Sequence, residues 1–115
     1  MKKYLLFFLF ATILMTTAEA QIIKTSLTLT VIDELGNSVE GASVKIFEKE
    51  ADYLAEKNPA AEGKTDAKGI VKFKDLKTLP YFVLARKGDK DNAGGGEQTG
   101  KLEEHKFNKA RIVIQ

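Results

Sequence analysis

Residues Gly63–Gly88, GKTDAKGIVKFKDLKTLPYFVLARKG, decide the fold of this chain. They read as a turn at 65–69, a short strand at 70–73 and a longer strand at 81–86, with Leu76 in a hydrophobic corner between the strands. In both strands apolar side chains alternate with other residues, which is the pattern of strands that bury one face. The side chains that we expect to share one core are Val71, Phe73, Tyr81, Val83 and Ala85.

The chain before this stretch predicts two strands, a short helix and a third, shorter strand. Residues 22–33 and 39–48 alternate as half-buried strands do. Residues 50–57 are rich in helix formers and stop at Asn58-Pro59, and a short strand at 61–65 follows. The residues that we place on the core face of the two strands are Leu27, Leu29, Val31, Val44 and Ile46.

The chain after this stretch predicts a loop and the closing strands. Gly88–Gly100 has five glycines in thirteen residues, too many for a packed strand, and reads as a flexible polar loop. A short strand at 99–102 and a last strand at 107–115, with Ala110, Ile112 and Ile114 in phase, complete the pattern. The predicted fold class is all-β: a single β-sandwich of about seven strands with one short helical insertion.

Residues 1–20 read as a cleavable signal peptide. Lys2 and Lys3 precede an apolar run of about a dozen residues, and Ala18-Glu19-Ala20 is a small-residue cleavage pattern before Gln21. A membrane anchor is the alternative, but a spanning helix needs about 20 apolar residues. We therefore expect an extracytoplasmic (periplasmic or secreted) protein whose mature part, residues 21–115, is one domain without a membrane span.

The charges of residues 21–115 are nearly balanced. Removing Lys2, Lys3 and Glu19 from the totals of 18 basic and 16 acidic residues leaves 16 and 15, a net charge of +1. This balance gives no reason to expect nucleic acid or an anionic membrane as a partner. The chain has no cysteine, so the exported domain depends on its core without disulfides.

The glycine and apolar positions resemble a known family. The pattern reads VxDxxG at 31–36, VxGAxVxI at 39–46, GxTDxxGxVxFxxL at 63–76 and YxVxA at 81–85. It resembles the carboxypeptidase regulatory-like domain, a transthyretin-like (prealbumin-like) β-sandwich of exported bacterial proteins, and it covers Leu27 to about Arg86. Pro80 departs from the family, which has glycine near that turn, so we expect the strand to begin at Tyr81 in an unpaired or edge position.

The resemblance implies a fold more than an activity. The regulatory-like domain carries no peptidase zinc site, and this chain has one histidine and no His-Glu-x-x-His motif. Related sandwich domains of bacterial adhesins form a Lys–Asn cross-link catalysed by an acid. The lysine and the acid of that site would fall near Val31 and Ala85, which are apolar here, so we expect no cross-link.

Three stretches carry candidate sites. Asp89, Asp91 and Asn92 partly match the start of a calcium-binding loop, although Ala93 and Gly100 occupy later ligand positions. The simpler interpretation is a polar loop, and we expect no cofactor. His105 lies beside Glu103 and Glu104, a neighbourhood that could support acid–base chemistry but that fits a solvated surface turn better.

The third candidate is a surface for a ligand or partner, formed by Tyr53, Phe82 and Leu84. If Tyr81, Val83 and Ala85 point into the core, Phe82 and Leu84 point outward. We expect the helix at 50–57 to cover them through Leu54 and Ala55; otherwise they form an exposed patch. For carbohydrate binding, which uses exposed aromatic rings, only Tyr53 and Phe82 are candidates, because the core requires the other aromatic residues.

These observations predict a non-catalytic secreted or cell-envelope module with an accessory binding or structural role. The alternative is a carbohydrate-binding module, and an enzyme is a more distant third. The expected partner is a protein or glycan at the cell envelope.

Overall fold

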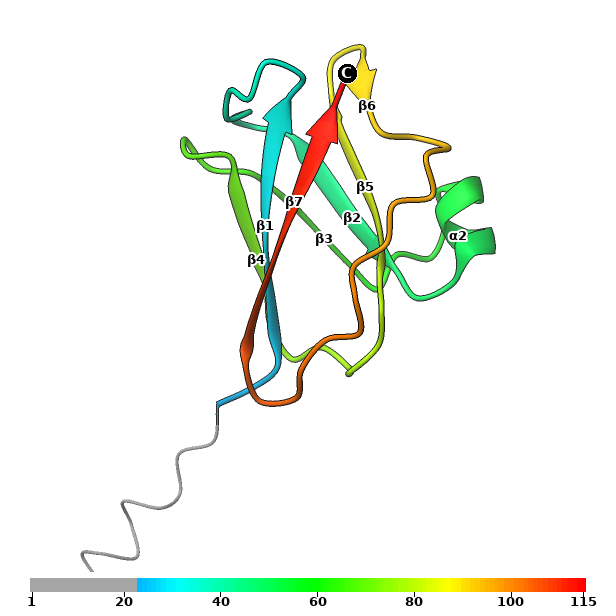
Figure 1. The fold of residues 1–115 in the computed structure, drawn as a ribbon. Coiled ribbons are helices and arrows are strands. Elements are labelled where there is room, and N and C mark those ends of the chain that lie inside the picture. The colour runs from blue at the N-terminus through cyan, green and yellow to red at the C-terminus, as the bar shows by residue number, and fades with distance from the viewer. Residues whose placement is uncertain (1–22) are drawn as a thin grey trace, which may run out of the picture.

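The computed structural model describes residues 23–115 as two β-sheets packed face to face, with one short helix at the side (Figure 1). The predicted signal peptide lies outside the described residues. The three-stranded sheet has the order β4-β1-β7 and the four-stranded sheet has the order β3-β2-β5-β6. The predicted all-β sandwich is therefore confirmed.

The elements of the described residues are short, as is usual for a sandwich. Their bounds are β1 Ser26–Asp33, β2 Ser43–Phe47, α2 Glu50–Ala55, β3 Ala61–Lys64, β4 Ile70–Phe73, β5 Phe82–Lys87, β6 Lys90–Asp91 and β7 Phe107–Ile114. α2 has six residues, and no helix in residues 23–115 is long and apolar enough to cross a membrane.

The three-stranded sheet is built around β1. β4 pairs with it antiparallel, with Leu29 opposite Val71. β7 pairs with it in parallel over eight residues, from Ser26 opposite Phe107 to Asp33 opposite Ile114. Because β1 and β7 run the same way, the chain enters the sandwich at one end and its C-terminal residue lies at the other (Figure 1).

The four-stranded sheet is antiparallel throughout. β2 lies between β3 and β5, with Val44 opposite Gly63 on one side and Ala85 on the other. β6 pairs with the end of β5, where Asp91 lies opposite Arg86. β6 also reaches across to the other sheet, because the backbones of Asp91 and Gln115 exchange two hydrogen bonds.

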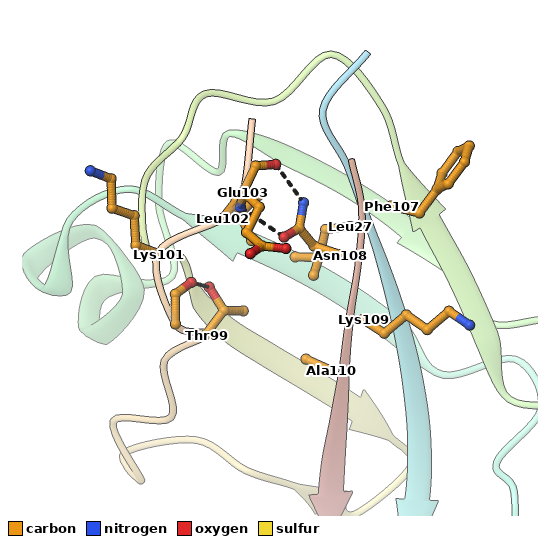
Figure 2. A pocket seen from close by; sticks show the side chains of 10 residues that line it. Leu27, Thr99, Lys101, Leu102, Glu103, Phe107, Asn108, Lys109 and Ala110 are labelled. Atoms are coloured by element: carbon orange, nitrogen blue, oxygen red, sulfur yellow. Dashed lines mark hydrogen bonds between the residues drawn. The ribbon is translucent and has the colours of Figure 1, made fainter. Parts of the chain in front are cut away.

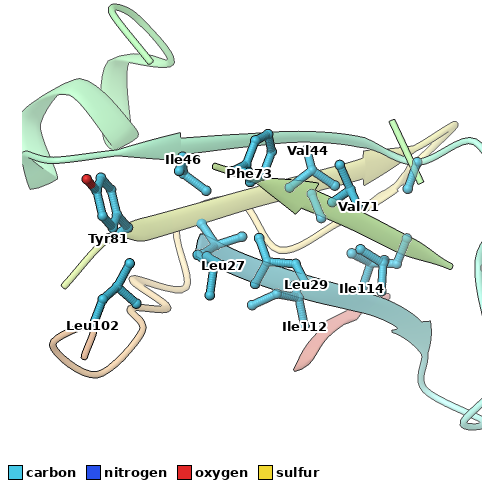
Figure 3. Close-up of a cluster of buried hydrophobic side chains, with 14 residues drawn as sticks. Leu27, Leu29, Val44, Ile46, Val71, Phe73, Tyr81, Leu102, Ile112 and Ile114 are labelled. Carbon is cyan, nitrogen blue, oxygen red and sulfur yellow. The ribbon is translucent and has the colours of Figure 1, made fainter. Parts of the chain in front are cut away.

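The core lies between the two sheets (Figure 3). Apart from Phe107, which is exposed, every strand residue predicted to face it does so: Ala110 is partly buried and the others are at most 8% exposed. Leu76 packs against the same cluster from the corner after β4. Alternation along the strands was sufficient to assign these positions, because successive side chains of a strand point to opposite faces of the sheet.

The structure corrects the predictions at several places. β1 begins at Ser26 and leaves residues 23–25 outside the strand, and β2 begins at Ser43, four residues later than expected, after a turn at 40–41. β5 begins at Phe82, one residue later than expected, and the N–H of Tyr81 is donated to Thr99 Oγ1. Residues 99–102 form no strand; the strand-like contact is a bridge between Phe82 and Gln98. The glycine-rich segment from Gly88 contains the two-residue strand β6 and follows the edge of β5, where Glu97 O accepts from Val83 N.

Candidate binding surfaces

A second apolar cluster lies outside the core, between α2 and the outer face of the four-stranded sheet. Phe47, Tyr53 and Leu84 are at most 4% exposed there, and Phe82 is partly buried against them. The Tyr53 ring meets Phe47 edge-on, with centroids 6.0 Å apart, and lies 5.8 Å from Phe82. The expectation that the helix covers Phe82 and Leu84 is therefore confirmed.

The residue that makes this contact is not the one expected. Leu54 is 60% exposed and Ala55 is exposed, whereas Tyr53 is 2% exposed. The prediction chose the wrong face of the helix, because a six-residue helix is too short for its apolar spacing to define one face. Tyr53 and Leu84 consequently cannot form the exposed ligand or partner surface considered for them.

The hydroxyl of Tyr53 joins α2 to the glycine-rich segment. It donates to Asn92 O at 2.9 Å and accepts from Gly96 N at 3.2 Å. The same end of the helix is held by Arg86, whose guanidinium makes two hydrogen bonds, of 2.9 and 3.1 Å, to the carboxylate of Glu56. The bidentate bond holds the pKa of Glu56 below its usual range.

The calcium candidates point in different directions. Asn92 is buried, and its side-chain amide accepts from Ala85 N at 2.8 Å and donates to Val83 O at 2.8 Å. Asp91 bonds to Arg86 and to the backbone of Ala93, while Asp89 is exposed. Within residues 23–115 no three acidic or histidine side chains are grouped to hold a metal ion. Asn92 acts as a backbone clamp for β5.

His105 lies in the surface turn before β7. Its ring Nδ1 is 2.9 Å from Ile23 O, and its backbone N–H donates to Thr25 Oγ1 at 2.9 Å. Its Nε2 is 3.4 Å from Glu104, and both side chains are more than half exposed. These contacts hold the turn against the start of β1.

The positions considered for a cross-link are deep in the core. Val31 and Ala85 are both fully buried. The buried polar residues of the described chain are Thr25, Ser26, Thr65 and Asn92, so no lysine of residues 23–115 is buried. Within residues 23–115 there is therefore no buried lysine that could supply the amine of such a bond.

A hollow of about 290 Å³ lies between the start of β7 and the segment before it (Figure 2). Its most central polar group is Asn108, whose amide accepts from Glu103 N and donates to the backbone oxygens of Ser26, Glu103 and Lys106. These bonds use both ends of the Asn108 amide to hold the turn, so Asn108 has no free hydrogen-bonding group to offer a ligand in this hollow.

The outer face of the β4-β1-β7 sheet is basic, and the sequence did not indicate this. Lys72 and Lys109 both lie opposite Thr28, and Arg111 lies opposite Thr30 in the next row. Figure 2 shows Phe107 and Lys109 on the side of β7 away from Asn108 and Ala110. None of the strand positions on this side is acidic. We call Lys72, Lys74, Lys109 and Arg111, with the threonines between them, the basic face.

A second hollow, of about 260 Å³, opens at one end of the basic face. Its lining residues are Ile23, Lys24, Ser26, Lys72, Lys74 and Phe107, and we call it the Ser26 hollow. Phe107 is 60% exposed, and Lys72 Nζ lies 4.8 Å from the centre of its ring. The interpretation of Phe107 as a core residue was wrong, because β7 turns its odd-numbered positions outward.

Within residues 23–115 the four cations of the basic face make no ion pair, whereas Lys24 is paired with Asp75 at 3.3 Å. The sheet therefore carries a concentration of positive charge that its own strands do not neutralise. This local positive charge is not evident from the net charge of the whole sequence, which is close to zero.

Neither a protein-family model nor a curated protein matches the sequence. Several solved structures are similar in fold. The Bacillus anthracis TIE protein aligns over 80% of this chain at 23% identity with a TM-score of 0.55, and BcpA, the major pilin subunit of Bacillus cereus, over 80% at 18% with 0.51. The group B streptococcus pilus 2b backbone protein aligns over 78% at 16% with 0.50.

These likenesses show the β-sandwich fold. The chain spans 17%, 30% and 40% of the lengths of those three structures. It is thus similar to a part of each larger protein.

Proposed function

We propose that this protein is a non-catalytic module that works at or beyond the cell envelope, with an accessory binding or structural role, and that the basic face is its binding surface. Export rests on the signal-peptide pattern of residues 1–20, which leaves residues 21–115 as one domain of the regulatory-like type. The observation that carries the proposal is the segregation of Lys72, Lys109 and Arg111 onto one open sheet face of a nearly neutral chain, with Lys74 directly after the end of β4.

Three of the four buried polar side chains in residues 23–115 support a non-catalytic role. Thr65 Oγ1 accepts from Ala42 N and donates to Val39 O, Asn92 clamps β5, and Thr25 holds the turn at His105. Each of these side chains is bonded to backbone and so serves the fold. The likeness to domains of pilin proteins supports a surface role for the same sandwich.

The test is retention of the protein by the cell-envelope fraction of its own organism, measured by sedimentation at increasing salt. Lys109→Glu with Arg111→Glu should abolish retention, because the double change reverses two charges on the basic face. Lys49→Glu with Lys57→Glu, which changes the same charge near α2, should leave retention unchanged. No retention of the unaltered protein, or equal loss in both variants, would overturn the proposal.

A further inference from the structure

Ser26 is the one buried polar side chain of the described residues whose hydroxyl has no hydrogen-bond partner. The residue is 2% exposed and lies at the start of β1, with its side chain on the same side as Thr28 and Thr30. A buried hydroxyl without a hydrogen-bond partner destabilises the folded state. Since Ser26 lines the Ser26 hollow, a ligand group that entered the hollow could provide the missing hydrogen bond.

The rest of the hollow defines the chemistry of such a ligand. Lys72 and Lys74 supply positive charge, and they favour a carboxylate or phosphate. Phe107 presents an exposed ring at the rim, a surface on which the C–H face of a sugar can pack. One small site therefore combines a cationic pair, an aromatic ring and a free hydroxyl.

The basic face extends this chemistry beyond one sugar. Lys109 and Arg111 are two residues apart on one strand, hence about 7 Å, and Lys72 and Lys109 are two strands apart, hence about 10 Å. A single anion could not contact all of these cations. An extended ligand with repeated charges and hydroxyl groups could do so, and the half-buried threonines between the cations could bond to its hydroxyls.

From this arrangement we infer that the basic face binds an acidic polysaccharide, with one acidic sugar seated in the Ser26 hollow. The inference rests on the proposed function and names its ligand class. The unpartnered hydroxyl and the exposed ring favour a glycan over an anionic membrane, because a lipid surface would use the charges without the hollow. The expected export of the chain favours a glycan over nucleic acid.

The probe is polygalacturonate, which carries one carboxylate on each sugar, and its fully methyl-esterified form is the matched neutral control. A phosphomannan, a polysaccharide that carries phosphate groups on its sugars, tests the phosphate form of the same chemistry. The protein should bind at least one of the two acidic polymers, and the neutral polymer at least tenfold more weakly. Lys109→Gln with Arg111→Gln should weaken binding at least tenfold, whereas Lys49→Gln with Lys57→Gln should change it less than threefold.

Ser26→Ala separates a binding role from a structural one. Removing a hydroxyl that has no partner should leave the melting temperature unchanged or slightly higher. If the hollow seats a sugar, the same variant should bind the acidic polymer several-fold more weakly, as should Phe107→Ala. Unchanged binding by both variants would overturn the assignment of the hollow.

Two further outcomes would overturn the ligand class. One is equal binding of the esterified polymer, and the other is binding of duplex DNA or phosphatidylglycerol vesicles as tight as that of the acidic glycans at the same salt. If the envelope fraction retains the protein through Lys109 and Arg111 but neither acidic polymer binds, the inference fails and the proposed function stands. If the envelope fraction does not retain the protein, the proposed function fails.

Discussion

Gly69 occupies a position that no other residue can take without strain. Its φ is +76°, and a Cβ added there would lie 2.8 Å from the backbone oxygen of Val31. The carbonyl of Gly69 also accepts from Val31 N at 2.8 Å, so the turn cannot move away without losing a bond to β1. The turn before β4 is therefore fitted directly against the central strand.

Gly69→Ala should reduce the free energy of unfolding by about 2 kcal/mol or more, because left-handed backbone costs roughly 1–2 kcal/mol and the contact with Val31 adds to it. The control is Gly88→Ala, which has a φ of +61° but no atom within 4 Å of the added Cβ. The free energy of unfolding of Gly88→Ala should fall by only about 1 kcal/mol, the cost of the left-handed backbone alone. Urea denaturation midpoints measure both, and equal losses would contradict the argument from close approach.

Asn92 shows how a candidate ligand can be a structural residue. Asn92→Ala would leave Ala85 N and Val83 O without their side-chain partner, so we expect a loss of about 1–3 kcal/mol in stability. Asp89→Ala, at an exposed position, should change stability by less than about 0.5 kcal/mol. Thermal melts measure both changes in stability.

We expect no calcium-dependent rise in melting temperature. A bound ion would stabilise the folded state by ligand linkage. A rise with calcium that disappears in Asp89→Ala or Asp91→Ala would show that the loop holds the ion.

Helix α2 is stabilised by its packing against the rest of the protein. A six-residue helix is too short to be stable alone, and Tyr53 supplies both its buried ring and its hydroxyl bonds to the glycine-rich segment. The helix, the outer face of β5 and the segment after β6 are thus one unit with Tyr53 at its centre.

Tyr53→Ala should destabilise the protein by about 3–5 kcal/mol, as is usual for loss of a buried aromatic ring. The neighbouring Leu54→Ala removes a side chain that is 60% exposed and should cost less than about 0.5 kcal/mol. Chemical denaturation of the two variants provides the comparison. Similar losses for both would mean that the helix packs through the other face.

Phe82→Ser tests whether α2 packs on the outer face of β5. It should cost about 2–4 kcal/mol, because Phe82 packs against the buried ring of Tyr53. An unchanged midpoint together with lost self-association would instead identify an exposed partner surface.

The whole molecule should be a plain polypeptide with a cleaved leader. The exported protein should begin at Gln21 or its cyclised form. Its intact mass should equal the plain sum of its residues, because Val31 and Ala85 provide neither amine nor acid for a cross-link. Mass spectrometry checks both points: a retained leader, or the loss of one ammonia or water mapped to a linked pair, would contradict the prediction.

Several features of the molecule could be predicted from the sequence by itself. These were the two-sheet sandwich, the core side chains of its main strands and the helical insertion. The reason is that strand alternation has a period of two residues, so a correct phase assigns every side chain of a strand to one face. Val71, Phe73, Val83 and Ile112 are all buried as that phase requires.

Other features were decided only by tertiary structure. The environments predicted for Tyr53 and Phe107 were wrong: Tyr53 on α2 is buried against the outer face of the four-stranded sheet, and Phe107 on β7 is exposed. A short helix has no readable phase, and an aromatic residue at the end of a strand can face either way. The burial of Tyr53 and the exposure of Phe107 both depend on which residues lie next to them in the folded sheets.

The basic face is the clearest example of a feature that no pattern in the sequence predicts. Lys72 is far from Lys109 and Arg111 along the chain, so composition and charge runs do not reveal the three cations as one group. They gather because β4 and β7 pair with opposite edges of β1 in registers that set both lysines opposite Thr28. Hydrophobic alternation determined which side of each strand faced outward, and the pairing of strands distant in sequence determined which charges became neighbours.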